Sequence, residues 1–439
     1  MHKDSSPGVE DEQQARETTV SSGYANYVLG VLFVVYIFNF VDRQVLSVFI
    51  GPIKEEFGAS DTQMGLLVGF AFALLYTIAG IPIARWADKG NRRNIIALGL
   101  LVWSAMTVLS GFARSFVQLA LARVGVGIGE AAGSPPAHSL IADYFTLDKR
   151  GTALAIYASG AFVGGALAFL AGGYLREFFD WRTAFIVVGA PGILMALIVR
   201  FTVKEPPRGM SEQRTGQAAS STFMDTLRFL LDSRAWVIMM AGYSLLSLTG
   251  YAILMWAFEF LIRVHAMDSV SAGTLMGIVV GVGGCLGSLL GGALVDRAGA
   301  KRVSRAVSFP ALVTIAAIPF GAVFLLADNL DIGRWCFFAF FLLLNVYIPA
   351  MFSANQNLAK LDMRATASAL MLFCANIVGA GAGPLLVGAL SDAFADTYGT
   401  ESIRYALLCC LGIGGLGSLL LLLCSRFLEA DIERAKSSA

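Results

Sequence analysis

Apolar stretches alternate with short polar segments along almost the whole chain. Since a helix of about 20 residues crosses the roughly 30 Å hydrocarbon core of a membrane, each stretch predicts one transmembrane helix. The stretches lie near residues 26–50, 63–85, 94–113, 116–140, 151–173, 183–203, 234–262, 271–295, 306–327, 333–358, 365–390 and 402–426. The pattern therefore predicts an all-α membrane protein with twelve transmembrane helices.

Polar segments divide these stretches into two sets of six. We predict a disordered cytoplasmic N-terminus over 1–25, an N-terminal six-helix bundle over 26–203, a cytoplasmic linker over 204–233, a C-terminal six-helix bundle over 234–427 and a cytoplasmic tail over 428–439. The first segment is polar and charged, so it cannot bury enough apolar surface to fold by itself.

Composition supports a membrane protein and excludes several other classes. Of the 439 residues, 56% are hydrophobic and only 14% are charged, whereas soluble domains are nearer a quarter charged. A net charge of +1 argues against a nucleic-acid partner. The six cysteines lie in apolar segments without metal-type spacing, and no motif of a soluble enzyme is present. We expect no enzymatic activity, cofactor or metal, and we expect a monomer.

Lysine and arginine are unevenly distributed between the two sides of the predicted membrane. If the N-terminus is cytoplasmic, 23 of the 32 fall in cytoplasmic segments and 7 in outer ones. The remaining two, Arg43 and Arg123, lie inside the membrane. Because cytoplasmic loops carry the excess of positive residues, we predict that both termini are cytoplasmic.

The two halves of the chain contain related sequences. Ala84-Arg-Trp-Ala-Asp88-Lys89-Gly-Asn91-Arg92-Arg93 corresponds to Gly292-Ala-Leu-Val-Asp296-Arg297-Ala-Gly299-Ala-Lys301, and the two aspartates are 208 residues apart. A second pair of segments begins at Arg150 and Arg364, with six of the first sixteen positions identical. Such a repeat predicts two pseudo-symmetric six-helix bundles with a substrate site between them near the membrane midplane.

Four charged residues lie inside predicted transmembrane helices: Asp42 and Arg43 in the first, and Arg123 and Glu130 in the fourth. A charge at the centre of a membrane helix costs about 2.5–3.5 kcal/mol on insertion scales, so these side chains should face the protein interior. At 1.5 Å per residue, Asp42 lies about 24 Å from the cytoplasmic end of its helix and Arg123 about 10 Å from the outer end. On a roughly 30 Å span the two are at similar depths and can pair, with Arg43 and Glu130 completing the network. Gly125, Gly127 and Gly129 should let a neighbouring helix approach closely.

The paired loops at Asp88 and Asp296 resemble the signature of the major facilitator superfamily, and the twelve predicted helices extend this resemblance over the whole chain. It implies the major facilitator fold and a cytoplasmic gate, in which Asp88 would accept hydrogen bonds from Arg92 or Arg93; the alternative is a charge cluster that only sets topology. The residues assigned to this gate are Asp88, Lys89, Arg92, Arg93, Asp296 and Arg297. Asn91 replaces the family's turn glycine and can adopt the left-handed conformation.

Within the superfamily, the chain resembles the spinster family of lysolipid and sphingolipid transporters. The resemblance lies in Phe40-Val41-Asp42-Arg43-Gln44-Val45-Leu46-Ser47, in Arg123 to Ala131, and in Ile141-Ala142-Asp143-Tyr144-Phe145. It implies a bacterial-type spinster homologue, a multi-pass protein of the cell (inner) membrane. The pattern Arg-x-x-x-Gly-x-Gly-Glu-Ala from Arg123 to Ala131 also occurs in anion:cation symporters of the same superfamily.

These resemblances and the intramembrane charges suggest a mechanism. We predict that Asp42 carries the proton, since burial and a nearby guanidinium act on a carboxyl pKa in opposite directions; the alternative is a permanently ionised Asp42–Arg123 pair that only orients two helices. Glu130 is either a second protonation site or a partner that holds Arg43 or Arg123 for an anionic headgroup. These two arginines form the candidate substrate or charge network.

Further polar residues lie in the second half. Glu259 and Arg263 are one turn apart and can form an extracellular gate or a plain surface ion pair. The predicted polar cavity residues are Asn345, Asn355, Gln356 and Asn376. The favoured function is proton-coupled transport of an amphipathic anionic substrate, lysophospholipid or sphingolipid-like, by alternating access. The alternatives are a proton-coupled symporter of small organic anions such as sugar acids, and a non-transporting membrane receptor or scaffold.

Overall fold

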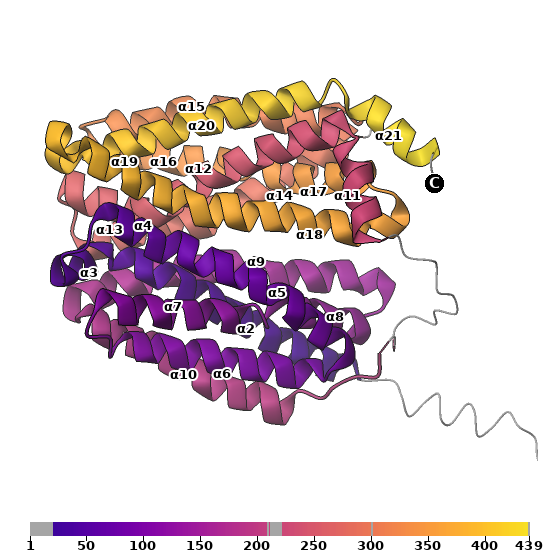
Figure 1. The fold of residues 1–439 in the computed structure, drawn as a ribbon, viewed down its shortest axis with the longest axis horizontal. Helices are drawn as coiled ribbons and strands as arrows, with labels where there is room; N and C mark the ends of the chain where they lie inside the picture. Colours follow the sequence, from indigo (N-terminus) through magenta and orange to yellow (C-terminus); the bar gives the residue numbers. More distant parts are fainter. Residues whose placement is uncertain (1–20, 209, 211–221, 300–301, 438–439) are drawn as a thin grey trace, which may run out of the picture.

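The computed structural model describes residues 21–208, 210, 222–299 and 302–437. These residues form helices and no strand, and the helices assemble into two bundles that lie against each other (Figure 1). The N-terminal bundle contains α2 (Ser22–Val48), α3 (Ile50–Phe57), α4 (Asp61–Gly65), η1 (Leu66–Phe70), α5 (Ala71–Lys89), α6 (Arg92–Ser110), α7 (Phe116–Glu130), α8 (Ser134–Tyr144), α9 (Leu147–Phe178) and α10 (Trp181–Thr202).

The C-terminal bundle repeats this order with short additions. It contains α11 (Phe223–Leu231), α12 (Arg234–His265), α13 (Ser269–Ile278), η2 (Val279–Gly283), α14 (Gly284–Gly299), α15 (Arg305–Leu326), α16 (Leu330–Leu344), α17 (Tyr347–Leu358), η3 (Leu361–Met363), α18 (Arg364–Cys374), η4 (Ala375–Ala382), α19 (Gly383–Tyr398), η5 (Gly399–Glu401), α20 (Ser402–Cys424) and α21 (Leu428–Ser437). The fourth helix of each bundle is interrupted, after Glu130 and after Leu344.

Eleven stretches of the described residues are long and apolar enough to cross a membrane. The last stretch has 59 residues, which as one straight helix would measure about 88 Å, nearly three times the roughly 30 Å hydrocarbon core. The chain reverses within it at Gly399, whose φ of 55° favours glycine, and α20 runs back beside α19 (Figure 1). This stretch therefore contains two crossings, and the predicted all-α fold of twelve transmembrane helices is confirmed.

The helices continue further into the polar segments than the sequence pattern predicted. Helix α2 already begins at Ser22, inside the segment predicted to be disordered, because Ser21 caps it and the hydroxyl of Tyr24 donates to the carbonyl of Thr202. Helix α11 lies within the predicted linker and α21 within the predicted tail. Residues 1–20, 209, 211–221 and 438–439 of these segments lie outside the described residues.

The molecule has two ends. We call the end where α11 and α21 lie the terminal face, and the end where α3 and η5 lie the distal face (right and left in Figure 1). The lysine and arginine distribution predicts that the terminal face is cytoplasmic.

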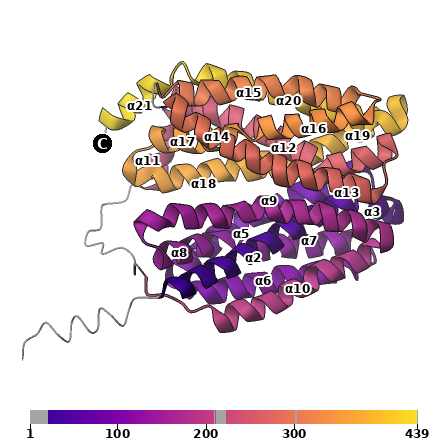
Figure 2. The same cartoon turned by 180° about the vertical axis from the view of Figure 1, so that it is seen from behind.

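The two bundles approach each other most closely near the distal face, where α9 lies against α13 (Figure 2). At the same end, α4 lies against α19. A Cβ atom on Gly173 would lie 2.5 Å from the carbonyl oxygen of Ser269, and one on Gly388 would lie 2.1 Å from that of Asp61. Real Cβ atoms are essentially never found so close. Small residues thus allow backbone-to-backbone contact between the bundles at this end.

Candidate functional site

An ion pair between α2 and α7 lies inside the N-terminal bundle. The Nε atom of Arg43 donates to Oε2 of Glu130 at 2.6 Å, and the Glu130 side chain is fully buried. Three rings surround the guanidinium of Arg43, with Cζ-to-centroid distances of 5.3 Å to Phe40, 4.9 Å to Phe72 and 4.7 Å to Tyr76. Cation–π contacts of this kind stabilise a cation that has left water.

Asp42 and Arg123 are also buried, each with 2% of its surface exposed, but they are not paired through their side chains. Nη2 of Arg123 donates to the backbone carbonyl of Asp42 at 3.1 Å. Among the described residues, Oδ1 of Asp42 and both Nε and Nη1 of Arg123 have no hydrogen-bond partner. The structure thus differs from the predicted side-chain pair. Helix rise predicts that the two residues lie at similar depths in the membrane, but it does not fix the direction in which each side chain leaves its helix.

The glycines of α7 let neighbouring helices pack closely against it. A Cβ atom on Gly129 would lie 2.7 Å from the backbone nitrogen of Trp103 in α6, and one on Gly127 would lie 3.1 Å from the carbonyl oxygen of Phe72 in α5. The glycines therefore serve two neighbouring helices rather than one. Glu130 is the last residue of α7, so the charge network lies at the break in this transmembrane segment.

A cavity of about 360 Å³ lies between the bundles. Its walls come from α2 and α9 on one side and from the C-terminal bundle on the other, and they are mainly aromatic and apolar. Tyr36 and Phe40 line it, and the Phe40 ring is one of those around Arg43. The polar lining residues other than tyrosine are Gln44, Ser247, Asn345 and Asn376. The charge network thus lies directly behind one wall of the cavity.

Two of the four predicted polar cavity residues lie elsewhere. Asn345 and Asn376 line the cavity, and each donates its amide to a carbonyl of its own helix. Asn355 is fully buried and accepts from Nε1 of Trp236, while Nε2 of Gln356 donates to Ser368. Residues on one helix point in different directions, so a series of amides in sequence does not form one polar wall.

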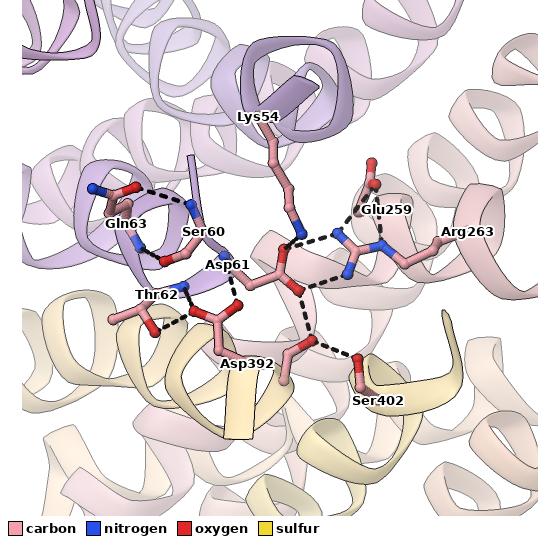
Figure 3. Close-up of polar contacts among 10 residues, drawn as sticks. Lys54, Ser60, Asp61, Thr62, Gln63, Glu259, Arg263, Asp392 and Ser402 are labelled. Carbon is pink, nitrogen blue, oxygen red and sulfur yellow. Dashed lines mark hydrogen bonds and ion pairs between the residues drawn. The ribbon is translucent and has the colours of Figure 1, made fainter. Parts of the chain in front are cut away.

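A polar network joins the two bundles at the distal face (Figure 3). The guanidinium of Arg263 donates to both carboxylate oxygens of Asp61, at 2.6 and 3.0 Å. Lys54 and Ser391 donate to the same carboxylate, each at 2.6 Å. Asp61 belongs to the N-terminal bundle, and Arg263 and Ser391 belong to the C-terminal one, so this network, which we call the distal clasp, holds the bundles together.

A second carboxylate of the distal clasp caps a helix of the opposite bundle. Asp392 of α19 accepts from the backbone nitrogens of Asp61 and Thr62 and from the hydroxyl of Thr62 (Figure 3). A carboxylate at a helix N-terminus satisfies unpaired N–H groups and interacts favourably with the helix dipole. Ser60 and Gln63 form a capping box at the same helix start, which is readable in the sequence. The contribution of Asp392, which comes from the other bundle, cannot be read from the sequence.

Glu259 extends the distal clasp. It lies 3.4 Å from Arg263 on its own helix and 3.3 Å from Nη1 of Arg176 in the other bundle. Glu259 and Arg263 therefore lie within ion-pair distance, as predicted. Their 3.4 Å contact is longer than the 2.6 Å contact between Arg263 and Asp61 in the same network. Sequence reasoning did not identify Lys54, Asp61, Arg176 or Asp392.

Known proteins with the same two-bundle architecture are similar to this chain. The model of the Major Facilitator Superfamily matches residues 32–384. A crystal structure of a bacterial homologue of the human lysosomal transporter spinster, in an inward-facing and unoccupied conformation, superposes with a TM-score of 0.86 at 31% identity, covering 94% of this chain and 99% of that one. The chain belongs to the spinster family of this superfamily.

Other relatives agree with this assignment. An MFS-type efflux pump of Mycolicibacterium smegmatis is 32% identical over 380 residues, covering 87% of both chains. Protein spinster homolog 1 of Xenopus tropicalis is 26% identical over 442 residues, covering 95% of this chain and 84% of that one. The predicted family and fold are confirmed: this spinster relative is a multi-pass membrane transporter and not an enzyme.

At the terminal face, the superfamily's loop between the second and third helices makes contacts other than the predicted ones. Arg92 is almost fully buried and pairs with Asp143 and, at 2.7 Å, with Glu205. The backbone nitrogen of Arg93 donates to the same Glu205. Asp88 is exposed and has no hydrogen bond or ion pair to the described residues. Glu205 of the linker contacts Arg92 and the backbone of Arg93 instead.

The turn in this loop also differs from the prediction. Asn91 has φ −79° and ψ 108°, an extended conformation, and its side chain caps α6 by accepting from the backbone nitrogen of Asn94. A left-handed residue is therefore not needed here. Lys89, Asp296 and Arg297 are exposed, and within the described residues they make no contact across the two bundles. The contacts of a closed cytoplasmic gate are absent from the described part of this conformation.

Proposed function

We propose that this spinster-family protein moves an amphipathic anionic substrate, lysophospholipid or sphingolipid-like, by proton-coupled alternating access across a cell (inner) membrane, with both termini in the cytoplasm. One observation carries the proposal: a cavity between the bundles has largely aromatic and apolar walls, and buried charges lie directly behind one of them. Apolar walls suit an acyl chain, and an arginine suits an anionic headgroup through charge-assisted hydrogen bonds.

The two arginines differ in how free they are to bind an anion. Arg43 is held by Glu130, whereas Arg123 makes one hydrogen bond to the described residues, to a backbone carbonyl. Arg43 lies next to the cavity wall through Phe40. An anionic headgroup that reaches Arg43 would compete with Glu130 for it, so substrate binding would change the environment of that carboxyl group.

Proton coupling follows from the same network. Oδ1 of Asp42 and Oε1 of Glu130 are buried without hydrogen-bond partners among the described residues. A buried carboxylate with an unpaired oxygen is costly, so such a group takes up or releases a proton when its access to water or its ion partner changes. Switching between conformations would change both the access of Asp42 to water and its ion partner. We therefore assign Asp42 as the proton carrier. Glu130 is assigned as the group that links substrate binding to protonation.

The alternative substrate class is a small organic anion such as a sugar acid. It is supported by the segment from Arg123 to Ala131, which also resembles anion:cation symporters. The cavity lining argues against a small organic anion, because the polar lining residues other than tyrosine are four neutral side chains. Transport assays with both substrate classes distinguish the two.

Replacing Asp42 by asparagine is expected to abolish substrate-driven proton flux. Asparagine keeps the size of the side chain but cannot carry a proton at neutral pH. The measurement uses purified protein in liposomes loaded with a pH-sensitive dye. Lysophosphatidylglycerol, sphingosine-1-phosphate or a hexuronate is added in separate experiments. Wild type should show proton flux with a lipid substrate, and the variant should fall to the level of protein-free liposomes.

The matched control is Asp331→Asn, the same chemical change at a side chain that is 84% exposed at the start of α16. It should behave as wild type. Flux driven by the hexuronate alone would transfer the protein to the organic-anion symporters. Lipid transport with undiminished proton flux in Asp42→Asn would show that Asp42 is not the proton carrier.

A further inference from the structure

Two arginines lie side by side at the terminal face of the C-terminal bundle. Arg297 is near the end of α14, and Arg305 is the first residue of α15. Both line a cavity of about 470 Å³ together with Leu294, Ala298, Ser308 and Phe309. Both are exposed, and neither guanidinium has a hydrogen bond or ion pair to any residue that the structure describes. The cavity thus offers two unpaired guanidinium groups and one hydroxyl.

The N-terminal bundle also has an arginine at the start of a helix on the terminal face. Arg92 is the first residue of α6, as Arg305 is of α15. Two carboxylates hold Arg92: Asp143, from the end of the fourth transmembrane segment, and Glu205, from the linker. The corresponding helix α17 contains no acidic residue. Arg92 and Arg305 thus each begin a helix at the terminal face, and among the described residues only Arg92 has carboxylate partners.

Two carboxylates lie near the arginines of the C-terminal bundle, and neither takes that role. Asp296 precedes Arg297, but it is exposed and makes no hydrogen bond or ion pair with the described residues. Glu429 of α21 accepts from the hydroxyl of Ser304 at 2.8 Å and contacts neither arginine. Among the residues that the structure describes, none supplies an anion to Arg297 or Arg305.

The surface that continues from this cavity is apolar and points outward from the bundle. On α14, Leu294 and Leu290 lie about one and about two turns before Arg297, respectively. On the adjacent α15, Phe309 and Leu312 follow Arg305. Leu290, Phe309 and Leu312 are 49%, 46% and 50% exposed, although they belong to membrane-spanning helices. Such residues face acyl chains, so the cavity lies where lipid headgroups and lipid tails meet.

We propose that the cavity between α14 and α15 is a binding site for an anionic phospholipid. Its phosphate would lie between Arg297 and Arg305, with Ser308 as a further donor, and its acyl chain would follow Leu294, Phe309 and Leu312. Arginine binds phosphate through paired, charge-assisted hydrogen bonds. Basic pockets between transmembrane helices on the cytoplasmic side are suited to anionic headgroups. This site is separate from the central cavity and does not depend on the transported substrate.

The test compares lipid retention by the wild-type chain and by the double variant Arg297→Gln/Arg305→Gln. Protein purified in detergent is titrated with phosphatidylglycerol, with phosphatidylcholine or with inorganic phosphate, and bound lipids are counted by native mass spectrometry. Wild type should retain phosphatidylglycerol in preference to phosphatidylcholine. The double variant should bind it about thirtyfold more weakly, since each arginine near an anionic lipid surface contributes about fivefold.

The matched control is Arg114→Gln, which removes an exposed arginine at the distal face, and it should leave the retention unchanged. A second variant, Arg297→Lys/Arg305→Lys, keeps both charges and should recover most of the binding. Equal loss in Arg114→Gln and in the double glutamine variant would overturn the proposal. So would a wild-type chain that shows no preference for phosphatidylglycerol, or one in which inorganic phosphate displaces the lipid completely.

Discussion

Replacing Glu130 by glutamine is expected to lower the free energy of unfolding by about 3 kcal/mol, the lower end of the range for breaking a buried ion pair. The change leaves the guanidinium of Arg43 inside the bundle without its carboxylate. The cost stays at the lower end because the rings of Phe40, Phe72 and Tyr76 continue to stabilise the cation. Denaturant titration in detergent micelles measures the loss.

The matched control is Glu56→Gln. Glu56 pairs with Arg182 at the same 2.6 Å, but the two side chains are 41% and 30% exposed, so the loss should stay within about 1 kcal/mol. The double variant Arg43→Gln/Glu130→Gln should recover stability relative to Glu130→Gln, because it no longer contains an unpaired buried charge. Equal losses for Glu130→Gln and Glu56→Gln would show that burial of the Arg43 pair does not govern its energy.

The fold could be predicted because the cost of placing polar groups in a membrane dominates the sequence pattern. Apolar stretches of the right length, the charge excess on one side and the repeated loops at Asp88 and Asp296 were sufficient for twelve helices in two halves. The ends of the helices could not be predicted in the same way. Helix α2 begins at Ser22 because Tyr24 contacts Thr202, a residue 178 positions away that hydropathy does not reveal.

The charge network could be predicted only in part, for a geometric reason. Helix rise gives the depth of a residue, and the depths of Asp42, Arg123 and Glu130 bring them into one region. Neighbours on a helix point about 100° apart, so Asp42 and Arg43 leave α2 toward different partners. Depth alone did not show that Arg43 would contact Glu130 while Arg123 contacts a backbone carbonyl.

The distal clasp was missed because it depends on how two rigid bundles are placed against each other. Asp392 caps α4 across 331 residues of sequence, and no local pattern contains that relation. The same dependence makes the clasp a candidate for control of the conformational equilibrium. Its contacts can exist only while the bundles are closed at the distal face.

Replacing Asp61 by asparagine is therefore expected to shift the protein toward a conformation that is open at the distal face. Asp61 is 2% exposed, and its carboxylate binds Lys54, Arg263 and Ser391. Asparagine keeps the volume but leaves Arg263, whose side chain is 16% exposed, and the partly exposed Lys54 without their shared anion. Since leaving one partner of such a network unpaired costs at least about 2 kcal/mol, the ratio of open to closed molecules should rise about thirtyfold or more.

Double electron–electron resonance, which measures the distance between two spin labels, tests this shift. The labels replace Arg114 in the N-terminal bundle and Thr397 in the C-terminal bundle, which are exposed near the distal face, after the six native cysteines are removed. Asp61→Asn should populate longer distances than the parent chain. Asp331→Asn, which breaks an exposed pair within α16, should not. If both variants give the parent's distance distribution, the distal clasp does not hold the bundles closed, and the glycine contacts between α9 and α13 become the stronger candidate for that role.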